Sequence, residues 1–272
     1  MAKKPKNFDE FYRKVQSDLL QHEVITNNPY TKWWKQGDAN TAQLVDLLRQ
    51  FSVFSNHFVP IQAKRMANAA TEAAERGARA ILGNEIGVAL DVPTGDIEGG
   101  DFSHREAHIN WLRDIGELLG IDRHALGRWA IGTQATHSFL EQLEATYGSR
   151  DPNVGAGASF AVETWAAWGI GEGAEAEANN FWKELIVGIQ GYNAKHRVPH
   201  GLKPIPTGFF QYHFDIEKGH ASNVMAELRE TFEEEQFRED KWLEGGFQAL
   251  DAVYVFWRGL DMARKKLARQ AA

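Results

Sequence analysis

The sequence predicts an all-α fold, a bundle of about seven to nine helices that forms one domain over residues 1–272. Apolar residues recur at three- and four-residue steps along most of the chain, which is the spacing of one face of a helix. Alternating apolar and polar residues, the pattern of a half-buried strand, are nearly absent. Because no fixed-period repeat, low-complexity segment or linker divides the chain, we expect a single domain.

The expected helices begin and end at recognisable signals. Asn7 precedes the first apolar periodicity and is expected to cap a helix there. In the long pattern over about 41–70, Pro60 is expected to kink or restart the helix. The Gly-, Pro- and Asp-rich stretch DVPTGDIEGGD predicts a loop, and the capping-box pattern SHRE, which starts at Ser103, predicts the start of the next helix. Further helices are expected over about 71–90, 122–147, 154–170, 174–195, 206–234 and 238–269.

Composition excludes several classes of protein. The chain has no cysteine, which excludes a disulfide framework, a thiolate metal site and a cysteine nucleophile. A net charge of -7 without a basic stripe argues against a nucleic-acid-binding protein. No apolar run has the length of a membrane span or of a signal peptide, so we expect a cytoplasmic protein without membrane attachment.

The stretch QYHFDIEKGH, residues 211–220, places His213, Glu217 and His220 in the spacing H-x3-E-x2-H. On a helix these three side chains fall within an arc of roughly 60°. Imidazole and carboxylate groups that face one object suit iron, manganese or zinc. A solvated polar face is the alternative, although apolar residues flank the three.

Two further glutamates lie among apolar residues of the predicted helices. Glu163 is flanked by aromatic and aliphatic residues in GASFAVETWAAWGIG, and Glu85 shares a helix face with apolar residues in GARAILGNEIGVALD. A buried carboxylate is costly unless it is paired with a cation or bound to a metal. His108 also lies on an apolar face, where a hydrogen-bonded core histidine is the alternative. Together with the H-x3-E-x2-H stretch, these residues make the ligand set of a dinuclear iron site.

The order of these candidate ligands distinguishes between families of di-iron protein. A pair of E-x-x-H motifs, the ferritin-like pattern, does not occur in the sequence. The order instead resembles that of the heme-oxygenase-like di-iron oxidases and oxygenases, relatives by fold of TenA and PqqC. In that family a glutamate and a histidine come first, a second glutamate lies on a middle helix, and a late helix carries H-x3-D-x2-H. NEIG followed by HINWLRDIGELLG is similar to the family's acidic-Gly stretch and the helix after it.

The resemblance implies a heme-oxygenase-like helical bundle and an O2-dependent oxidase or oxygenase that acts on a small organic substrate, amino-acid-like or a carboxylic acid. It implies two Fe2+ ions, with Mn as an alternative in one or both positions, a peroxo-di-iron intermediate and an external electron donor. Glu163, on a helix of its own, is expected to bridge the metals and to be catalytic. The implied metal ligands are Glu85, His108, Glu163, His213, Glu217 and His220.

Two positions depart from the family's pattern. Glu217 stands where the family usually has aspartate, so the ligand geometry would differ. Glu98, in DIEGGD, is an alternative to Glu85 as the first ligand because it resembles the family's Glu-Gly-Gly run. We prefer Glu85, since a helix fixes a ligand better than a glycine-rich loop does.

Other classes of function stay open. A cofactor-free oxidase similar to PqqC would use histidines without paired carboxylates, and a hydrolase similar to TenA would need the cysteine that this chain lacks. A non-catalytic helical interaction protein would have to neutralise its buried glutamates, for which Arg65, Arg79 and Arg105 are available. Exposed apolar stripes expected on the terminal helices are consistent with a homodimer. Four aromatic residues are expected in the core or in the wall of a substrate pocket: Trp165, Trp168, Phe209 and Phe210.

Overall fold

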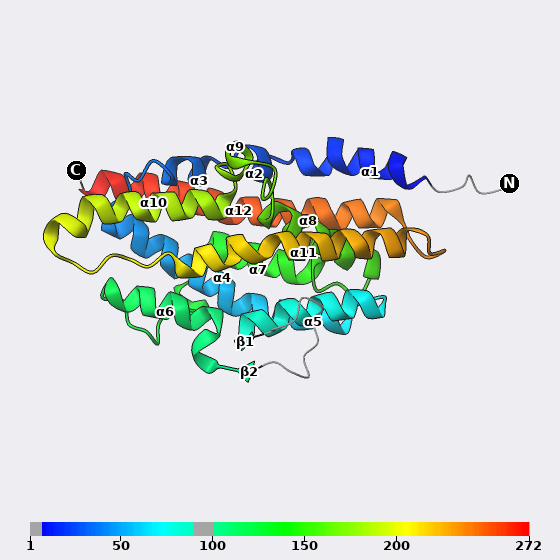
Figure 1. Cartoon of the computed structure of the whole chain (residues 1–272), viewed down its shortest axis with the longest axis horizontal. Coiled ribbons are helices and arrows are strands. Elements are labelled where there is room, and N and C mark those ends of the chain that lie inside the picture. The colour runs from blue at the N-terminus through cyan, green and yellow to red at the C-terminus, as the bar shows by residue number, and fades with distance from the viewer. Residues whose placement is uncertain (1–6, 90–100, 272) are drawn as a thin grey trace.

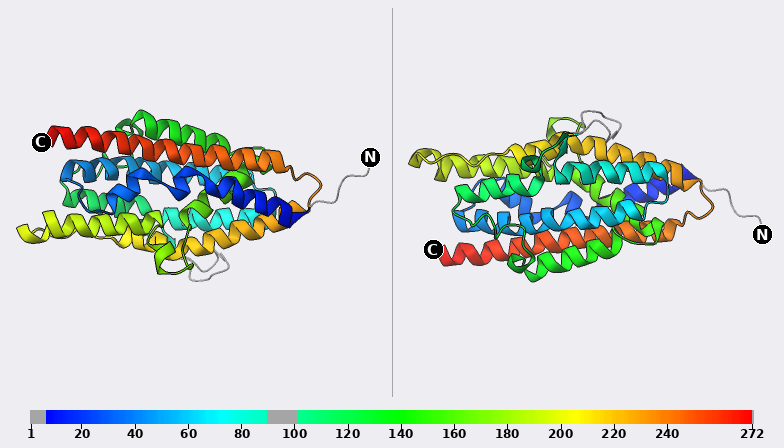
Figure 2. Two further views of the ribbon diagram at one scale, coloured as in Figure 1. Left: turned by 90° about the horizontal axis from the view of Figure 1, so that it is seen from above. Right: turned by 90° about the horizontal axis from the view of Figure 1, so that it is seen from below.

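The computed structural model describes residues 7–89 and 101–271. The chain forms an elongated bundle whose long helices run along a common axis (Figure 1, Figure 2). Within the described ranges, nine helices have ten or more residues, which agrees with the predicted all-α bundle. The helices are α1 (Phe8–Ser17), α2 (Glu23–Thr26), α3 (Pro29–Trp34), α4 (Thr41–Ala67), α5 (Glu72–Ile86), α6 (His108–Leu118), α7 (Gln134–Thr146), α8 (Pro152–Ala166), α9 (Ala174–Glu177), α10 (Phe181–His196), α11 (Gly208–Phe232) and α12 (Glu239–Ala271).

Two sequence signals, the cap expected at Asn7 and the break expected at Pro60, have different outcomes in the structure. The Asn7 side chain accepts a hydrogen bond from the backbone N–H of Glu10, which confirms the expected start of α1. In contrast, α4 continues unbroken through Pro60, so the expected restart there is wrong. The buried Phe58 and Ile61 on either side of the proline hold the helix against the core.

The start of α6 differs from the prediction. The Ser103 side chain forms no capping hydrogen bond, and a 3-10 turn over His104–Glu106 precedes the helix. α6 therefore begins at His108 instead of at the SHRE stretch. Just before this turn, β1 (Val88–Ala89) pairs with β2 (Asp101–Phe102) in a short antiparallel ladder that connects the end of α5 to this region.

Two other predicted helices are shorter or divided. The helix expected over 122–147 exists only in its second half, because Thr133 caps α7 and the residues before it form turns. The stretch 174–195 is divided into α9 and α10, since Asn180 breaks it by capping α10. In both cases a polar side chain that binds the backbone sets the boundary, which apolar periodicity does not reveal.

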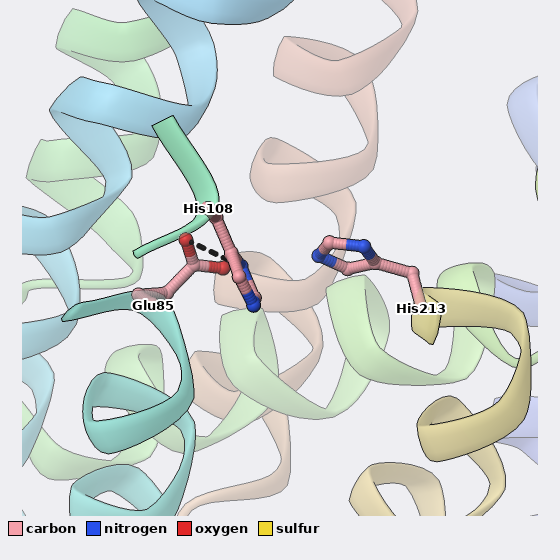
Figure 3. A group of neighbouring side chains, drawn as sticks. All are labelled: Glu85, His108 and His213. Carbon is pink, nitrogen blue, oxygen red and sulfur yellow. Dashed lines mark ion pairs between the residues drawn. The ribbon is translucent and has the colours of Figure 1, made fainter. Parts of the chain in front are cut away.

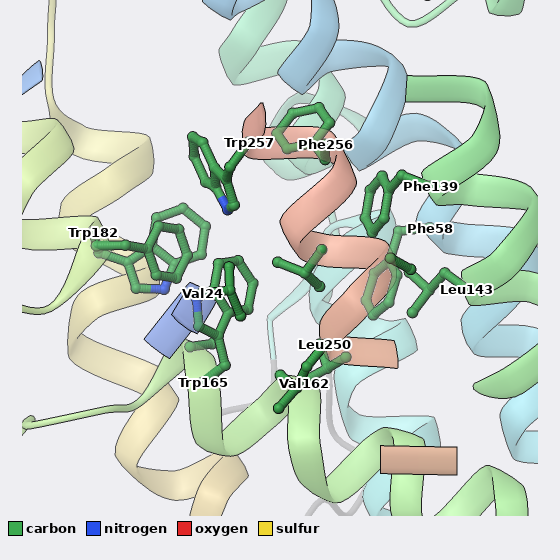
Figure 4. Packing of buried hydrophobic residues seen from close by; sticks show 14 of the residues in the cluster. Val24, Phe58, Phe139, Leu143, Val162, Trp165, Trp182, Leu250, Phe256 and Trp257 are labelled. Atoms are coloured by element: carbon green, nitrogen blue, oxygen red, sulfur yellow. The ribbon is translucent and has the colours of Figure 1, made fainter. Parts of the chain in front are cut away.

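The interior of the bundle is filled by aromatic side chains from several helices (Figure 4). α12 packs along α7 and α8, and α11 packs along α8, α10 and α5. α8 and α12 approach so closely that a Cβ atom on Gly157 would lie 1.8 Å from the carbonyl oxygen of Trp242. Because this neighbour is backbone, it has no rotamer with which to give way, and only glycine fits.

No helix in the described ranges combines the length and the apolar character needed to cross a membrane.

Replacing Gly157 by alanine is expected to lower the free energy of unfolding by about 1–3 kcal/mol, because the methyl group overpacks the contact between α8 and α12. Urea unfolding measures this change. The matched control is Gly77→Ala inside α5, where nothing lies within 4 Å of an added Cβ. That variant should be as stable as the unchanged protein or slightly more stable. Equal stability of both variants would contradict the packing described here.

Candidate metal centre

Four helices deliver candidate ligands to one buried cavity. α5, α6 and α8 contribute one side chain each, and α11 contributes three on successive turns. The structure thus brings together all six residues that the sequence singled out, whereas Glu98, the alternative first ligand, lies outside the described residues. The ligand atoms form two groups, and within each group they lie within 4.8 Å of one another. These groups are Glu85, His108 and His213, and Glu163, Glu217 and His220.

In the first group, Glu85 Oε2 lies 3.0 Å from His108 Nδ1 (Figure 3). Gly87 makes this approach possible because it ends α5 with a φ of 87°. A Cβ there would lie 2.3 Å from Ser103 O and 2.6 Å from Ala107 N, so only glycine lets the end of α5 pass so close to the start of α6. The contact between Glu85 and His108 does not have hydrogen-bond geometry, and within the described ranges neither buried atom has another partner.

The tautomer of His213 is fixed by its own helix. Its Nδ1 lies 2.7 Å from the carbonyl oxygen of Phe209, so Nδ1–H donates and Nε2 carries the lone pair. Burial lowers the pKa of His213 well below its ordinary value, His108 lowers it further, and the hydrogen bond to Phe209 opposes both. The ring also stacks on Trp182, with centroids 4.5 Å apart. His213 is therefore a neutral, oriented imidazole, the form that binds metal ions.

In the second group, His220 lies between two carboxylates. Its Nδ1 is 3.2 Å from Glu217 Oε2 and 3.5 Å from Glu163 Oε2. The hydroxyl of Tyr147 donates a hydrogen bond to Glu163 Oε1 at 2.8 Å. Tyr147 was not predicted from the sequence: it is the C-cap residue of α7, and no local spacing associates it with a side chain of α8. Trp182, from α10, was missed for the same reason.

Comparison with known proteins identifies the fold of the chain. No protein-family model matches the chain, and no curated protein does. A CADD-like protein of unknown function from Nostoc punctiforme has a similar structure, with a TM-score of 0.62 and 16% identity over 94% of this chain and 96% of that one. A domain of unknown function with a heme oxygenase-like fold from Shewanella denitrificans gives a TM-score of 0.61 and 15% identity over 99% of this chain and 97% of that one. The chain has a heme-oxygenase-like fold. This finding confirms the predicted fold class.

In this heme-oxygenase-like bundle, His220 carries the positive charge of the second group. Burial by itself would lower the pKa of His220, but the hydrogen bonds and the negative charges of Glu163 and Glu217 outweigh it and raise that pKa to about 10. Burial raises the pKa of Glu217, and His220 opposes the rise. At neutral pH the proton on His220 therefore stands between two carboxylates, where a metal cation would otherwise fit.

In the described part of the chain, no arginine or lysine forms an ion pair with the candidate ligands. Among the described residues, the ion pairs of Glu85, Glu163 and Glu217 are all formed with histidines. Arg65 and Arg79, which the sequence offered as possible partners of the buried glutamates, are paired with Glu227 and Glu75 instead. This arrangement speaks against a purely structural role for the buried glutamates, because such a role would need permanent cationic partners.

The cavity itself is small and mostly apolar. The volume open to the centres of water molecules is about 60 Å³, which is enough for a few waters. Trp165 and Phe209 form part of its wall, Phe210 packs in the core, and Trp168 lines a different cavity. The other apolar wall residues are Phe51, Phe54, Phe58, Ile81, Val162, Ala166, Trp182 and Ile216.

The stability of the metal-free protein should fall as pH rises. The pKa of His220 is raised to about 10 in the folded chain, against about 6.5 in the unfolded chain. Its contribution is therefore fully present below pH 6.5 and lost progressively up to about pH 10. Urea unfolding of chelator-treated protein across this range should show a decrease of up to about 5 kcal/mol. His220→Gln should remove most of this pH dependence, and an unchanged slope in that variant would contradict the assignment.

Proposed function

We propose that this protein is a non-heme di-iron oxidase or oxygenase that uses O2 to oxidise a small organic molecule. The observation that carries the proposal is the pair of adjacent donor groups, three carboxylates and three histidines, on one buried cavity. Carboxylate oxygens and neutral imidazole nitrogens are the ligands of non-heme iron, and Mn(II) is an alternative in one or both positions. The order of the six ligands along the chain, which resembles that of heme-oxygenase-like di-iron enzymes, supports the same assignment.

The side chains fit two metal ions. Glu85 Oε2 and His108 Nδ1 are buried and lack a hydrogen-bond partner in the described part of the chain, which is unusual for polar atoms unless a ligand satisfies them. His213 would complete the first group through Nε2, the nitrogen left free by its bond to the helix backbone. In the second group a divalent cation would replace the proton on His220 and neutralise the carboxylates beside it.

Glu217 is the carboxylate that we expect to bridge the two groups. The negative charges of Glu163 and of Glu85 both raise the pKa of Glu217. Glu85 belongs to the first group and Glu163 to the second, so Glu217 lies near a carboxylate of each group. The sequence predicts the bridging role for Glu163. One oxygen of Glu163 accepts a hydrogen bond from Tyr147, but both oxygens keep a lone pair for a metal, so Glu163 stays a candidate for a second bridge.

The protein contributes orientation, a proton and the exclusion of water. Bound ferrous ions would supply electrons to O2, and we expect an external donor to restore them. Phe209 O fixes the ring of His213, and Tyr147 holds a proton at its hydroxyl oxygen, 2.8 Å from Glu163 Oε1. The aromatic wall excludes bulk water, which strengthens electrostatic interactions in the site and suppresses side reactions. The cavity is small, so we expect only the reacting part of a small substrate to enter it beside the ions.

Anaerobic titration with Fe(II) should give two irons per chain, and exposure of the loaded protein to O2 should produce a transient visible absorbance band. In His213→Ala, loss of a first-group ligand should reduce the bound iron to one per chain or fewer. The control is His124→Ala, an exposed histidine outside the cavity, which should still bind two irons. One iron or none in the unchanged protein, or two tightly bound irons in His213→Ala, would contradict the proposal.

Tyr147→Phe should weaken Fe(II) binding by about 10- to 100-fold, because Glu163 loses the hydrogen bond that orients it. The measurement is competition with a chromogenic iron chelator. Tyr192→Phe is a matched control, since Tyr192 is also buried and its hydroxyl bonds to Thr41 Oγ1 at 2.9 Å, away from the cavity. If both variants bound iron as tightly as the unchanged protein, Tyr147 would have no part in the centre.

A further inference from the structure

Two half-buried aromatic side chains contact a candidate ligand of the first group. Trp111 follows His108 by one turn of α6, and Tyr212 lies on α11 immediately before His213. Between ring centroids, Tyr212 is 5.5 Å from His108, Trp111 is 6.2 Å from His108, and Trp111 is 5.4 Å from Tyr212. These spacings are those of tilted and edge-to-face aromatic contacts. The three rings therefore form one continuous contact that begins at a buried ligand.

Within the described ranges, no other tryptophan or tyrosine combines a ring contact with a ligand histidine and exposure to solvent. Trp182 stacks on His213, but it is only 5% exposed. Tyr147, which donates a hydrogen bond to Glu163, is fully buried. Trp111 and Tyr212 are therefore the two oxidisable rings that connect a candidate ligand directly to the surface.

Trp111 lines an open cleft on the surface. The cleft lies beside the turn before α6, α6 itself and the start of α11, and its volume open to the centres of water molecules is about 810 Å³. Arg105, Glu106 and Asp114 also line it, so its wall carries charges of both signs. A dissolved reductant can therefore reach Trp111, whereas the cavity of the candidate centre, at about 60 Å³, is too small for a molecule larger than a few waters.

The chemistry of the proposed centre gives these rings a use. Reduction of O2 to two waters takes four electrons and four protons, of which two ferrous ions supply two electrons and a bound substrate supplies two more. When no substrate is bound, the last two electrons must come from another donor, or side chains around the centre are oxidised instead. Tryptophan and tyrosine are, after cysteine, the side chains that lose one electron most readily, and this chain has no cysteine.

We propose that Trp111 and Tyr212 form a protective one-electron relay, which supplies these last electrons from a dissolved one-electron reductant such as ascorbate. The relay rests on the proposed di-iron function. In each of two steps, Tyr212 gives one electron to the oxidised centre and its hydroxyl proton to water. Trp111 then gives one electron and its indole N–H proton to the Tyr212 radical, and ascorbate gives one electron and one proton to the Trp111 radical. Both side chains are restored, and ascorbate is oxidised.

Pulse radiolysis of the full-length, chelator-treated protein tests the exchange between the two rings without iron. Azide radicals remove one electron from exposed tryptophan, and the oxidised indole loses its N–H proton to water. We expect the Trp111 radical to take one electron and one proton from Tyr212, the reverse of the relay step. The tryptophanyl absorbance should then decay as the tyrosyl absorbance rises, in a phase whose rate is independent of protein concentration. Tyr212→Phe and Trp111→Phe should each lose this phase.

Tyr254→Phe and Trp129→Phe are the matched controls, and both should keep the phase. Tyr254 is half-buried, as Tyr212 is, but its ring contacts His22. Trp129 is 39% exposed and stacks on His137. If folded Tyr212→Phe kept every phase of the unchanged protein, the two rings would be packing residues only, and the relay would be overturned.

Electron paramagnetic resonance of the Fe(II)-loaded protein, frozen soon after exposure to O2 without substrate, connects the relay to the centre. We expect a tyrosyl radical signal that ascorbate removes and that Tyr212→Phe loses but Tyr254→Phe keeps. An equal signal in Tyr212→Phe, or no signal in a protein that binds two irons and consumes O2, would overturn the relay. Failure to bind iron would contradict the di-iron assignment, and with it the protective role, whereas the radiolysis result would stand by itself.

Discussion

The constraint on which the centre depends is electrostatic: three glutamate side chains converge in an aromatic interior, and no arginine or lysine among the described residues pairs with them. Carboxylates placed together away from water repel one another and lose their hydration. In the metal-free chain, the proton on His220 supplies part of the missing positive charge. Two divalent cations would supply all of it, and this is why we regard the buried carboxylates as metal ligands and not as packing defects.

The fold brings the candidate ligands from distant parts of the chain to rigid positions around one cavity. α11 carries three of them on one face over successive turns, so their relative placement is fixed by helix geometry alone. The first group depends on a close backbone contact at Gly87, the residue that ends α5. This contact lets Glu85 approach His108 across the turn before α6. Hydrogen bonds from outside the ligand set, Tyr147 to Glu163 and His213 to a backbone carbonyl, then hold individual side chains in one orientation.

Several of the candidate ligands could be singled out from sequence because they violate local patterns. A glutamate such as Glu163 amid apolar residues is visible without a structure, and the H-x3-E-x2-H spacing places three side chains on one helix face. Helix boundaries were less predictable, as the late starts of α6 and α7 show, because side chains that bind the backbone compete with apolar periodicity. Tyr147 and Trp182 could not be predicted, since only the tertiary packing of separate helices brings them to the ligands.

The most direct test of the di-iron centre is anomalous X-ray diffraction at the iron absorption edge, from crystals loaded anaerobically with Fe(II). Two anomalous peaks about 3.5–4 Å apart are predicted, one beside Glu85, His108 and His213 and the other beside Glu163 and His220, with Glu217 in contact with both. A single peak, peaks only at the protein surface, or an empty cavity in iron-loaded crystals would contradict the account.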